Sequence, residues 1–399
     1  AQLRLEAINL GVLKLLSTKI ESPLSDTGSK ILLQLFADSE LNDKLIPSSF
    51  VGCLFQYASI SASISSSAVD NLVQCFQCIC KEVNIPKLLS KDLILSLNYV
   101  GEALSNDKEV LIIAEILETL LLGQKWDRRV VVLGGFGPWA TLCRYPCALL
   151  SMEKCLSAVL LHTKPTEMFV PAIENNIFLG LREIAASGVA ESLRIAAEAC
   201  CCLTSSEEAV LLCIKFGCLG ALKVLAEKAT DVAVLKDAGM TATSLCGKEE
   251  LRLPFVEFQG LDVLVALAQC PEEELQAHAG SALEMLTLNE ASMKSILDLP
   301  HGLAALNALA KSTSEIVLST CVQALSNLST SSMCIRISID GGLSVLSTLW
   351  LHGIPRICDQ ILVILQRVCC DGENLVAFIG GNGISLLETL IYDDCGPSA

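Results

Sequence analysis

The sequence predicts an all-helical solenoid, a fold in which short helices stack one repeat upon the next. Three observations predict it: an apolar phrase returns about every 41 residues, each copy has the spacing of helical faces, and aromatic residues are scarce. The phrase is a glycine followed by leucines four and seven residues later. In the C-terminal half it starts at Gly260, Gly302, Gly342 and Gly383, at intervals of 42, 40 and 41 residues.

The series extends toward the N-terminus in a weaker form. Cys218, Ile177 and Gly135 hold the first position at intervals of 42, 41 and 42 residues, and fainter copies start at Phe50 and Asn9. We therefore expect about nine or ten repeats in one continuous superhelix over residues 1–399. Its predicted parts are degenerate repeats over 1–122, an irregular repeat over 123–175, regular repeats over 176–391 and a tail over 392–399.

The composition agrees with stacked helices. A chain of 399 residues ordinarily suggests two or three domains, but a solenoid forms one body because each repeat packs only on its neighbours. Hydrophobic residues are 52% and aromatic residues 5%, which favours close helix packing over a β-sandwich. The long apolar run over 110–122 contains Glu115 and Glu118 and is too short to cross a membrane. We expect a soluble protein.

The stretch 289–327 illustrates how each repeat divides. Asn289 is placed to cap a short first helix over Glu290–Leu297, with an acidic residue in its first turn. Pro300 and Gly302 then break the helix.

A second and a third helix follow. The second has leucines on one face, at positions 303, 306 and 309. Ser312 and Glu315 are three residues apart, just before apolar positions that start with Ile316, and this spacing predicts a capping box. The same plan repeats over Ser331–Ile339, Gly342–Trp350 and Arg356–Val368.

These junctions resemble those of the armadillo repeat family. The stretch 339–349 resembles the junction between the first and second armadillo helices, as does 381–384, and 322–329 is similar to the end of an armadillo third helix. The match is good from Ile177 to Leu390, although no subfamily is identifiable, and a two-helix HEAT unit is the nearest alternative. The resemblance implies a right-handed α-solenoid of three-helix repeats, with the third helices lining its concave face.

Two segments depart from the pattern. Residues 124–129 interrupt the apolar periodicity, and four prolines lie at positions 138, 146, 165 and 171. Prolines there are expected to end helices, which predicts an irregular repeat around Leu150–Leu161. This region is either a kink or exposed loop with a function, or a repeat that has lost its pattern.

The sequence predicts neither an enzyme nor a cofactor or metal site. The glycine clusters at 134–137 and 380–383 lack the lysine and hydroxyl residue of a phosphate loop. Cys75, Cys78 and Cys80 have a spacing seen in zinc sites, but no second pair or nearby histidine follows. The four histidines are scattered. Core thiols and structural turns explain these residues better.

Cysteine usage and charge bear on location and partners. Most of the 20 cysteines occupy apolar helical positions, which favours buried thiols in a reducing, intracellular compartment over disulfides. The net charge of −16 argues against nucleic-acid binding and is compatible with basic protein partners or simply with solubility. The first residue is alanine and no leader pattern follows, so we expect a processed product or a segment of a longer protein.

The resemblance also points to a candidate surface. In peptide-binding armadillo proteins, an asparagine near the end of the third helix holds the ligand backbone, with a tryptophan one turn earlier. Here the asparagine position holds Ser244, Met285, Asn327 and Arg367, preceded by Cys202 and Leu160. The tryptophan position holds Glu198, Met240, Ser281, Gln323 and Val363.

Only Asn327 keeps the asparagine, so the groove is mixed and fairly apolar, which suits a helix or a folded domain better than an extended peptide. The candidate protein-binding residues are Gln323, Asn327, Arg367, Ser244 and Met285; packing against the next repeat is the alternative role for each. A further rival contact surface is the irregular region over 123–175.

These observations predict a non-catalytic scaffold or adaptor that binds other proteins, as peptide, helix or folded domain, along a superhelical surface within a larger assembly. One alternative is an importin-α-like nuclear transport or cargo adaptor, weakened by the missing asparagine and tryptophan pairs. Another is a regulatory armadillo domain of a larger multidomain protein. A β-catenin-like groove would need a row of basic residues, and Arg367 stands nearly alone. We expect a cytoplasmic location, with cytoskeletal or nuclear association left open.

Overall fold

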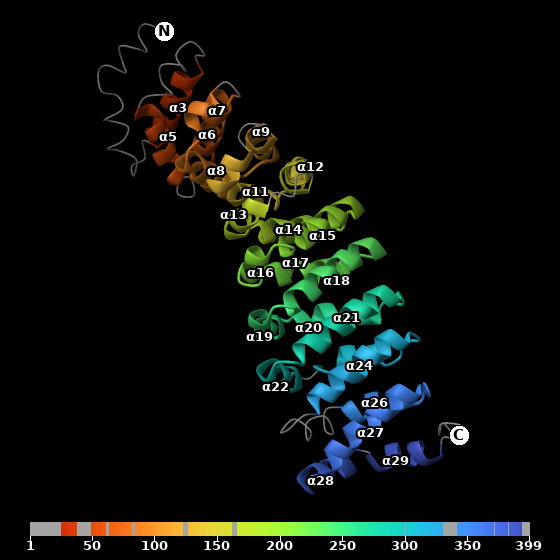
Figure 1. Ribbon diagram of the computed structural model, residues 1–399. Helices are drawn as coiled ribbons and strands as arrows, with labels where there is room; N and C mark the ends of the chain where they lie inside the picture. The colour runs from red at the N-terminus through yellow and green to blue at the C-terminus, as the bar shows by residue number, and fades with distance from the viewer. Residues whose placement is uncertain are drawn as a thin grey trace. The chain divides into compact units, whose positions relative to one another are not determined.

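The computed structural model describes residues 25–37, 49–60, 64–81, 84–122, 127–161, 166–299, 301–329, 341–370, 372–381 and 383–392. Within these ranges the regular structure is helical, without a strand, which confirms the predicted all-α class (Figure 1). The chain forms two compact units, Ala1–Leu203 and Thr204–Ala399. Each is described by itself below, and the single superhelix over 1–399 stays a prediction.

The C-terminal unit repeats a plan of three helices. The first helices are α16 (Glu207–Cys213), α19 (Glu249–Glu257), α22 (Glu290–Asp298) and α28 (Gly372–Gly380). The second helices are α17 (Cys218–Lys228), α20 (Gly260–Gln269), α23 (Ala304–Leu309), α26 (Gly342–Trp350) and α29 (Gly383–Tyr392). The third helices are α18 (Val232–Cys246), α21 (Glu273–Leu286), α24 (Glu315–Leu328) and α27 (Pro355–Cys369). The helix predicted over 331–339 lies outside the described residues.

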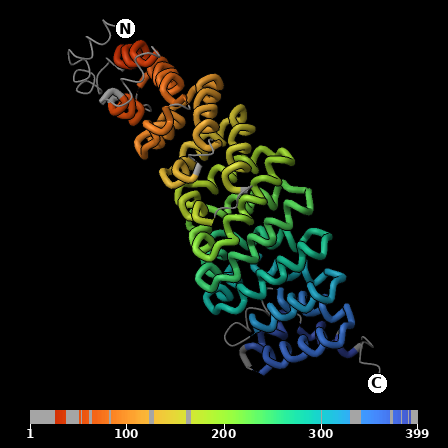
Figure 2. Tube along the Cα trace, turned by 45° about the horizontal axis from the view of Figure 1, so that its top comes forward, coloured from red at the N-terminus to blue at the C-terminus, as the bar shows by residue number. Residues whose placement is uncertain are grey.

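Equivalent helices of successive repeats pack on one another. The third helices stack in the order α18, α21, α24 and α27, and the second helices in the order α17, α20, α23, α26 and α29 (Figures 1 and 2). Among the first helices, α19 packs on α22. The repeat plan is thus armadillo-like, as the sequence predicted.

The N-terminal unit follows the same stacking rule with shorter first helices. Its third helices are α3 (Ser25–Phe36), α6 (Ser66–Ile79), α9 (Asp107–Leu122) and α12 (Leu149–Leu156), which pack in that order. Its second helices are α5 (Ser49–Ser59), α8 (Lys91–Ala103), α11 (Phe136–Leu142) and α14 (Ile177–Ala186). The first helices are α7 (Ile85–Leu88), α10 (Asp127–Val132) and α13 (Phe169–Glu174). The division between the units falls near the end of α15 (Ala190–Thr204).

The prolines of the irregular region act differently from the prediction. Pro138 and Pro171 stand in the first turns of α11 and α13 and so begin these helices rather than end them. A proline is tolerated in a first turn because the amides there have no partner within the helix. Pro146 starts a short 3-10 helix, and α12 continues into a π-helical turn over Ser157–Leu161, so the repeat itself is irregular. Pro165 lies outside the described residues.

The junctions before α11, α14, α17, α20 and α26 depend on two adjacent positions. The left-handed residue is the one before the recurring position: Gly134, Asn176, Gly217, Gln259 or Gly341, with φ between 65° and 104°. The recurring glycine is required for close packing instead. A Cβ on Gly302 would lie 1.8 Å from the Ile296 carbonyl oxygen, and one on Gly260 would lie 2.4 Å from the Phe255 ring.

Of the two predicted helix caps, the one at Asn289 is confirmed and the one at Ser312 is wrong. Asn289 caps α22 as predicted, because its side chain accepts a hydrogen bond from the Ser292 amide at 3.1 Å. The capping box at Ser312 was wrong, although α24 begins where expected. Ser314 is the N-cap residue, and the Ser312 hydroxyl donates to Oε1 of Gln276, from the preceding repeat, at 2.6 Å.

Candidate protein-binding face

One stripe of four positions is at least partly exposed on every third helix of the C-terminal unit. They are spaced i, i+4, i+7 and i+11, which places them on one stripe of the helix. We call these stripes together the third-helix face. It consists of Ala233, Asp237, Met240 and Ser244 on α18; Glu274, His278, Ser281 and Met285 on α21; Ile316, Thr320, Gln323 and Asn327 on α24; and Arg356, Gln360, Val363 and Arg367 on α27.

The structure brings together two of the predicted residues, Gln323 and Asn327. Nε2 of Gln323 donates to Oδ1 of Asn327 at 3.2 Å, and Nδ2 of Asn327 donates to the Thr287 hydroxyl at 3.1 Å. Thr287 is buried and follows α21, so this amide pair is joined to the preceding repeat. Part of the hydrogen-bonding capacity that would hold a ligand backbone is therefore used inside the unit.

The Arg367 side chain also forms hydrogen bonds with the preceding repeat. Its Nη1 donates to the carbonyl and hydroxyl oxygens of Ser326 at 3.2 and 3.1 Å and to the Ser329 hydroxyl at 3.3 Å. Ser244 and Met285 hold the equivalent positions on α18 and α21, Ser244 exposed and Met285 half-buried. The bonds from Asn327 and Arg367 cross repeat boundaries, as the packing role requires. A role of these residues in binding stays a prediction.

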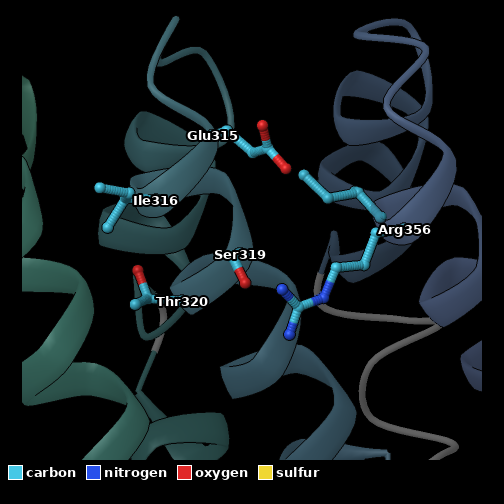
Figure 3. A pocket seen from close by; sticks show the side chains of 6 residues that line it. Glu315, Ile316, Ser319, Thr320 and Arg356 are labelled. Atoms are coloured by element: carbon cyan, nitrogen blue, oxygen red, sulfur yellow. The ribbon is translucent and has the colours of Figure 1, made fainter.

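A pocket that the sequence did not reveal lies between α24 and α27. It measures about 290 Å³ and is lined by Glu315, Ile316, Ser319, Thr320, Arg356 and Ile357. Figure 3 shows the Arg356 guanidinium extending from α27 toward Ser319 on α24. Ile316 is 66% exposed there, although its place in an apolar pattern suggested a core position. When two apolar residues are adjacent in the sequence, as Ile316 and Val317 are, the pattern alone does not show which of them a neighbouring helix covers.

The charges of the face are partly neutralised across repeats. Lys236 on α18 forms an ion pair of 2.5 Å with Glu274 on α21, and both side chains are exposed. Burial lowers the pKa of His278, which packs against Gly239, and this effect exceeds the opposing influence of Glu274. Burial therefore favours the neutral form of the His278 imidazole. Arg356 has no ion pair or hydrogen bond with another residue that the structure describes, so its charge is available to a ligand.

Other described parts of the chain show fewer features of a binding site. A pocket of about 420 Å³ lies between the second helices α20 and α23, near Gln269, Asn307 and Lys311. In the described part of the chain, histidine, cysteine and acidic side chains form no group of three or more that could hold a metal ion. Cys75 and Cys78 share a helix face in α6 as predicted; Cys75 is buried and Cys78 half-buried.

Comparisons with known proteins add the following. No family model matches the chain, and no curated protein matches its sequence. An engineered protein of known structure is 18% identical, covers 95% of this chain and 94% of its own, and has a TM-score of 0.40. A designed armadillo repeat protein in complex with the peptide (KR)4 is 20% identical over 58% of this chain and 98% of its own, with a TM-score of 0.41.

UNC-45 from Drosophila melanogaster is also similar, at 18% identity and a TM-score of 0.41. The match covers 95% of this chain and 49% of that protein. The armadillo-like assignment rests on the repeat plan of the chain itself. The chain has an armadillo-like repeat fold. Similarity at these scores carries no function across.

No single helix in the described ranges is long and apolar enough to cross a membrane. Only α16 and α17 taken together reach the required length and composition, and they are bent by 79° with respect to each other.

Proposed function

We propose that this chain is a non-catalytic scaffold that binds a partner protein on the third-helix face of its C-terminal unit. The observation that carries the proposal is the pocket between α24 and α27, which is lined by an exposed isoleucine, Ile316, and by Arg356, whose guanidinium has no partner among the described residues. Val363, 45% exposed, adds apolar surface on α27. Apolar anchors next to a charge that can form a forked bond are typical of protein-binding surfaces.

The face suits a helix or a folded domain better than an extended peptide. An extended peptide needs a regular ladder of side-chain amides for its backbone, and the four equivalent positions hold Ser244, Met285, Asn327 and Arg367 instead. The Asn327 amide is also bonded to Thr287. The same features disfavour an importin-α-like adaptor. The proposal includes a cytoplasmic location and membership of a larger assembly. The alternative is a regulatory armadillo domain of a larger multidomain protein.

The test compares the face with other exposed apolar residues of the same unit. The face variant carries Ile316→Asp and Val363→Asp. The matched control carries Leu288→Asp and Leu351→Asp, which are 60% and 62% exposed and lie at turns after α21 and α26. Partners are first identified by affinity capture with quantitative mass spectrometry, and their dissociation constants are then measured with purified proteins.

We expect the face variant to bind the partner at least about tenfold more weakly, or ~1.4 kcal/mol, because two apolar contacts are replaced by charges. The control should bind like the original chain, and circular dichroism should show equal helix content in all three. Equal weakening by face and control variants, or a face variant that binds normally, would remove the basis for the proposal.

A further inference from the structure

Equivalent pairs of positions recur at the boundaries between the third helices of the C-terminal unit. Glu274, the second residue of α21, forms an ion pair of 2.5 Å with Lys236, the fifth residue of α18. The same two positions hold Ile316 and Ala277 where α24 packs on α21, and Arg356 and Ser319 where α27 packs on α24. One boundary is therefore ion-paired, one is apolar, and one has a cation without an anion.

The cation without an anion is Arg356. Figure 3 shows its guanidinium extending toward Ser319, and both residues line the pocket of about 290 Å³. Neither side chain has an ion pair or hydrogen bond with another residue in the described ranges. The Arg356 side chain extends toward α24, so the missing anion is a property of the α24–α27 boundary, which the structure describes on both sides.

The position of Arg356 on α27 is also electrostatically unfavourable. It is the second residue of the helix, and the first turn of a helix is the positive end of the helix dipole. In keeping with that dipole, α21 has Glu274 and α24 has Glu315 in the first turn, whereas α27 has no acidic residue there. An anion bound next to Arg356 would therefore offset two unfavourable features, the unpaired guanidinium and its place at the helix start.

The other residues of the pocket restrict what can bind. Glu315 is exposed and forms no ion pair with Arg356, so an anion avoids it by binding on the Ser319 side of the pocket (Figure 3). There the Ser319 hydroxyl is a second donor. Ile316 and the buried Ile357 add apolar walls. These groups match a carboxylate on an aliphatic stem.

We propose that an aspartate or glutamate side chain of the partner protein enters this pocket and forms with Arg356 the ion pair that the chain itself lacks. The inference rests on the proposed function and specifies the partner: an amphipathic helix with an acidic residue one turn from an apolar residue that contacts Ile316. Residues three or four apart lie on the same helix face, so one helix can supply both contacts. A guanidinium holds a carboxylate through two parallel N–H groups.

The test changes the charges on the two sides of the pocket. Arg356→Gln removes the cation, Arg356→Glu reverses it, and Ser319→Asp supplies an anion within the chain. The matched control is Lys294→Gln, which removes an exposed cation on α22 outside the third-helix face. The probe is the purified partner captured on the original chain. Hydrogen exchange locates its bound segment, and each acidic residue of that segment is then changed to lysine in turn.

We expect Arg356→Gln and Ser319→Asp to weaken partner binding at least about tenfold, and Lys294→Gln to change it by less than about twofold. Arg356→Glu should bind more weakly still, and one acidic-to-lysine change in the partner should restore its affinity to within about tenfold of the original. Circular dichroism should show equal helix content in all variants, because the changed residues are at least partly exposed.

The outcomes separate this inference from the proposed function. If Arg356→Gln binds normally while the Ile316→Asp and Val363→Asp variant does not, the face binds a partner but the ion pair is wrong. Normal binding by Ser319→Asp, or no rescue of Arg356→Glu by any acidic-to-lysine change, would overturn the inference as well. Normal binding by both the Arg356 and the Ile316 variants would remove the proposed function and this inference together.

Discussion

Gly302 fixes the approach of one helix to another through the absence of a side chain. A Cβ at this position would lie 1.8 Å from the Ile296 carbonyl oxygen and 3.3 Å from the Ile296 side chain. A backbone oxygen cannot rotate away as a flexible side chain can, so α22 and α23 would have to separate. The recurrence of glycine in the sequence therefore reports a packing distance. The left-handed residue before it occurs at other junctions, such as Gln259 and Gly341, and not at His301.

We expect Gly302→Ala to lower the free energy of unfolding of the C-terminal unit by about 1–3 kcal/mol, the usual cost of overpacking. The control is Gly380→Ala, at the end of α28, where a Cβ would meet no atom within 4 Å. It should leave stability unchanged or raise it slightly, because alanine favours helix more than glycine. Urea unfolding followed by circular dichroism measures both. Equal stability of Gly302→Ala and the original chain would contradict the packing explanation.

At the scale of the element, the start of α24 depends on the neighbouring repeat. Ser312 is 6% exposed, and its hydroxyl donates to Oε1 of Gln276, while Nε2 of Gln276 donates to the Cys270 carbonyl. Gln276 thus links the loop after α20 to the loop before α24. The N-cap residue Ser314 instead donates to the exposed carboxylate of Glu273.

We expect Ser312→Ala to destabilise the unit by about 1–2 kcal/mol, because it removes a partly buried hydrogen bond that joins two repeats. Ser314→Ala should cost less, about 0.5 kcal/mol or below, since its bond is exposed to water. Thermal and urea unfolding of the two variants give the comparison. A larger loss for Ser314→Ala would show that the exposed bond to Glu273 contributes more to stability than the partly buried bond between Ser312 and Gln276.

The element scale also shows where sequence reasoning succeeds and where it ends. Periodicity predicted the three helices of a repeat because burial recurs with helical spacing, and Asn289 was placed correctly because its cap is local. Ser312 and Gln276 are 36 residues apart, so their bond is invisible to a local pattern. Ile316 and Arg356 form the pocket only once α24 and α27 are stacked, which is why the sequence identified the end of the third helices and missed their beginning.

At the scale of the whole molecule, buried thiols are distributed over both compact units. Cys80 and Cys155 lie in the N-terminal unit, and Cys246 and Cys321 lie in the C-terminal unit; all four are buried. Burial raises the pKa of the Cys80 and Cys155 thiols to about 12. It also raises the pKa of the Cys246 and Cys321 thiols far above the ordinary value. The cause is that a thiolate loses its hydration inside an apolar repeat.

These shifts predict that both units lose stability at alkaline pH. A thiol with a raised pKa stays protonated in the folded chain, whereas in the unfolded chain it ionises near pH 9, so the unfolded state binds fewer protons and is favoured as pH rises. The stabilisation is complete below about pH 8.5 and is lost between there and about pH 12. For each such thiol, the free energy of unfolding should fall by about 1.4 kcal/mol per pH unit above pH 9.

The measurement is urea unfolding between pH 7 and pH 10.5 in the presence of reductant, with the Cys80→Ala and Cys321→Ala double variant as comparison. Removing one thiol from each unit should make the alkaline loss shallower by about 1.4 kcal/mol per pH unit in the unfolding of each unit, because each unit loses one such thiol. Alkylation at pH 9 gives an independent check: Cys370, which is exposed, should react at once, while Cys80 and Cys321 should react only as the chain unfolds. Rapid alkylation of Cys80 and Cys321 in the folded chain would show that their repeats open readily, and a pH-independent stability would show that burial does not hold these thiols protonated.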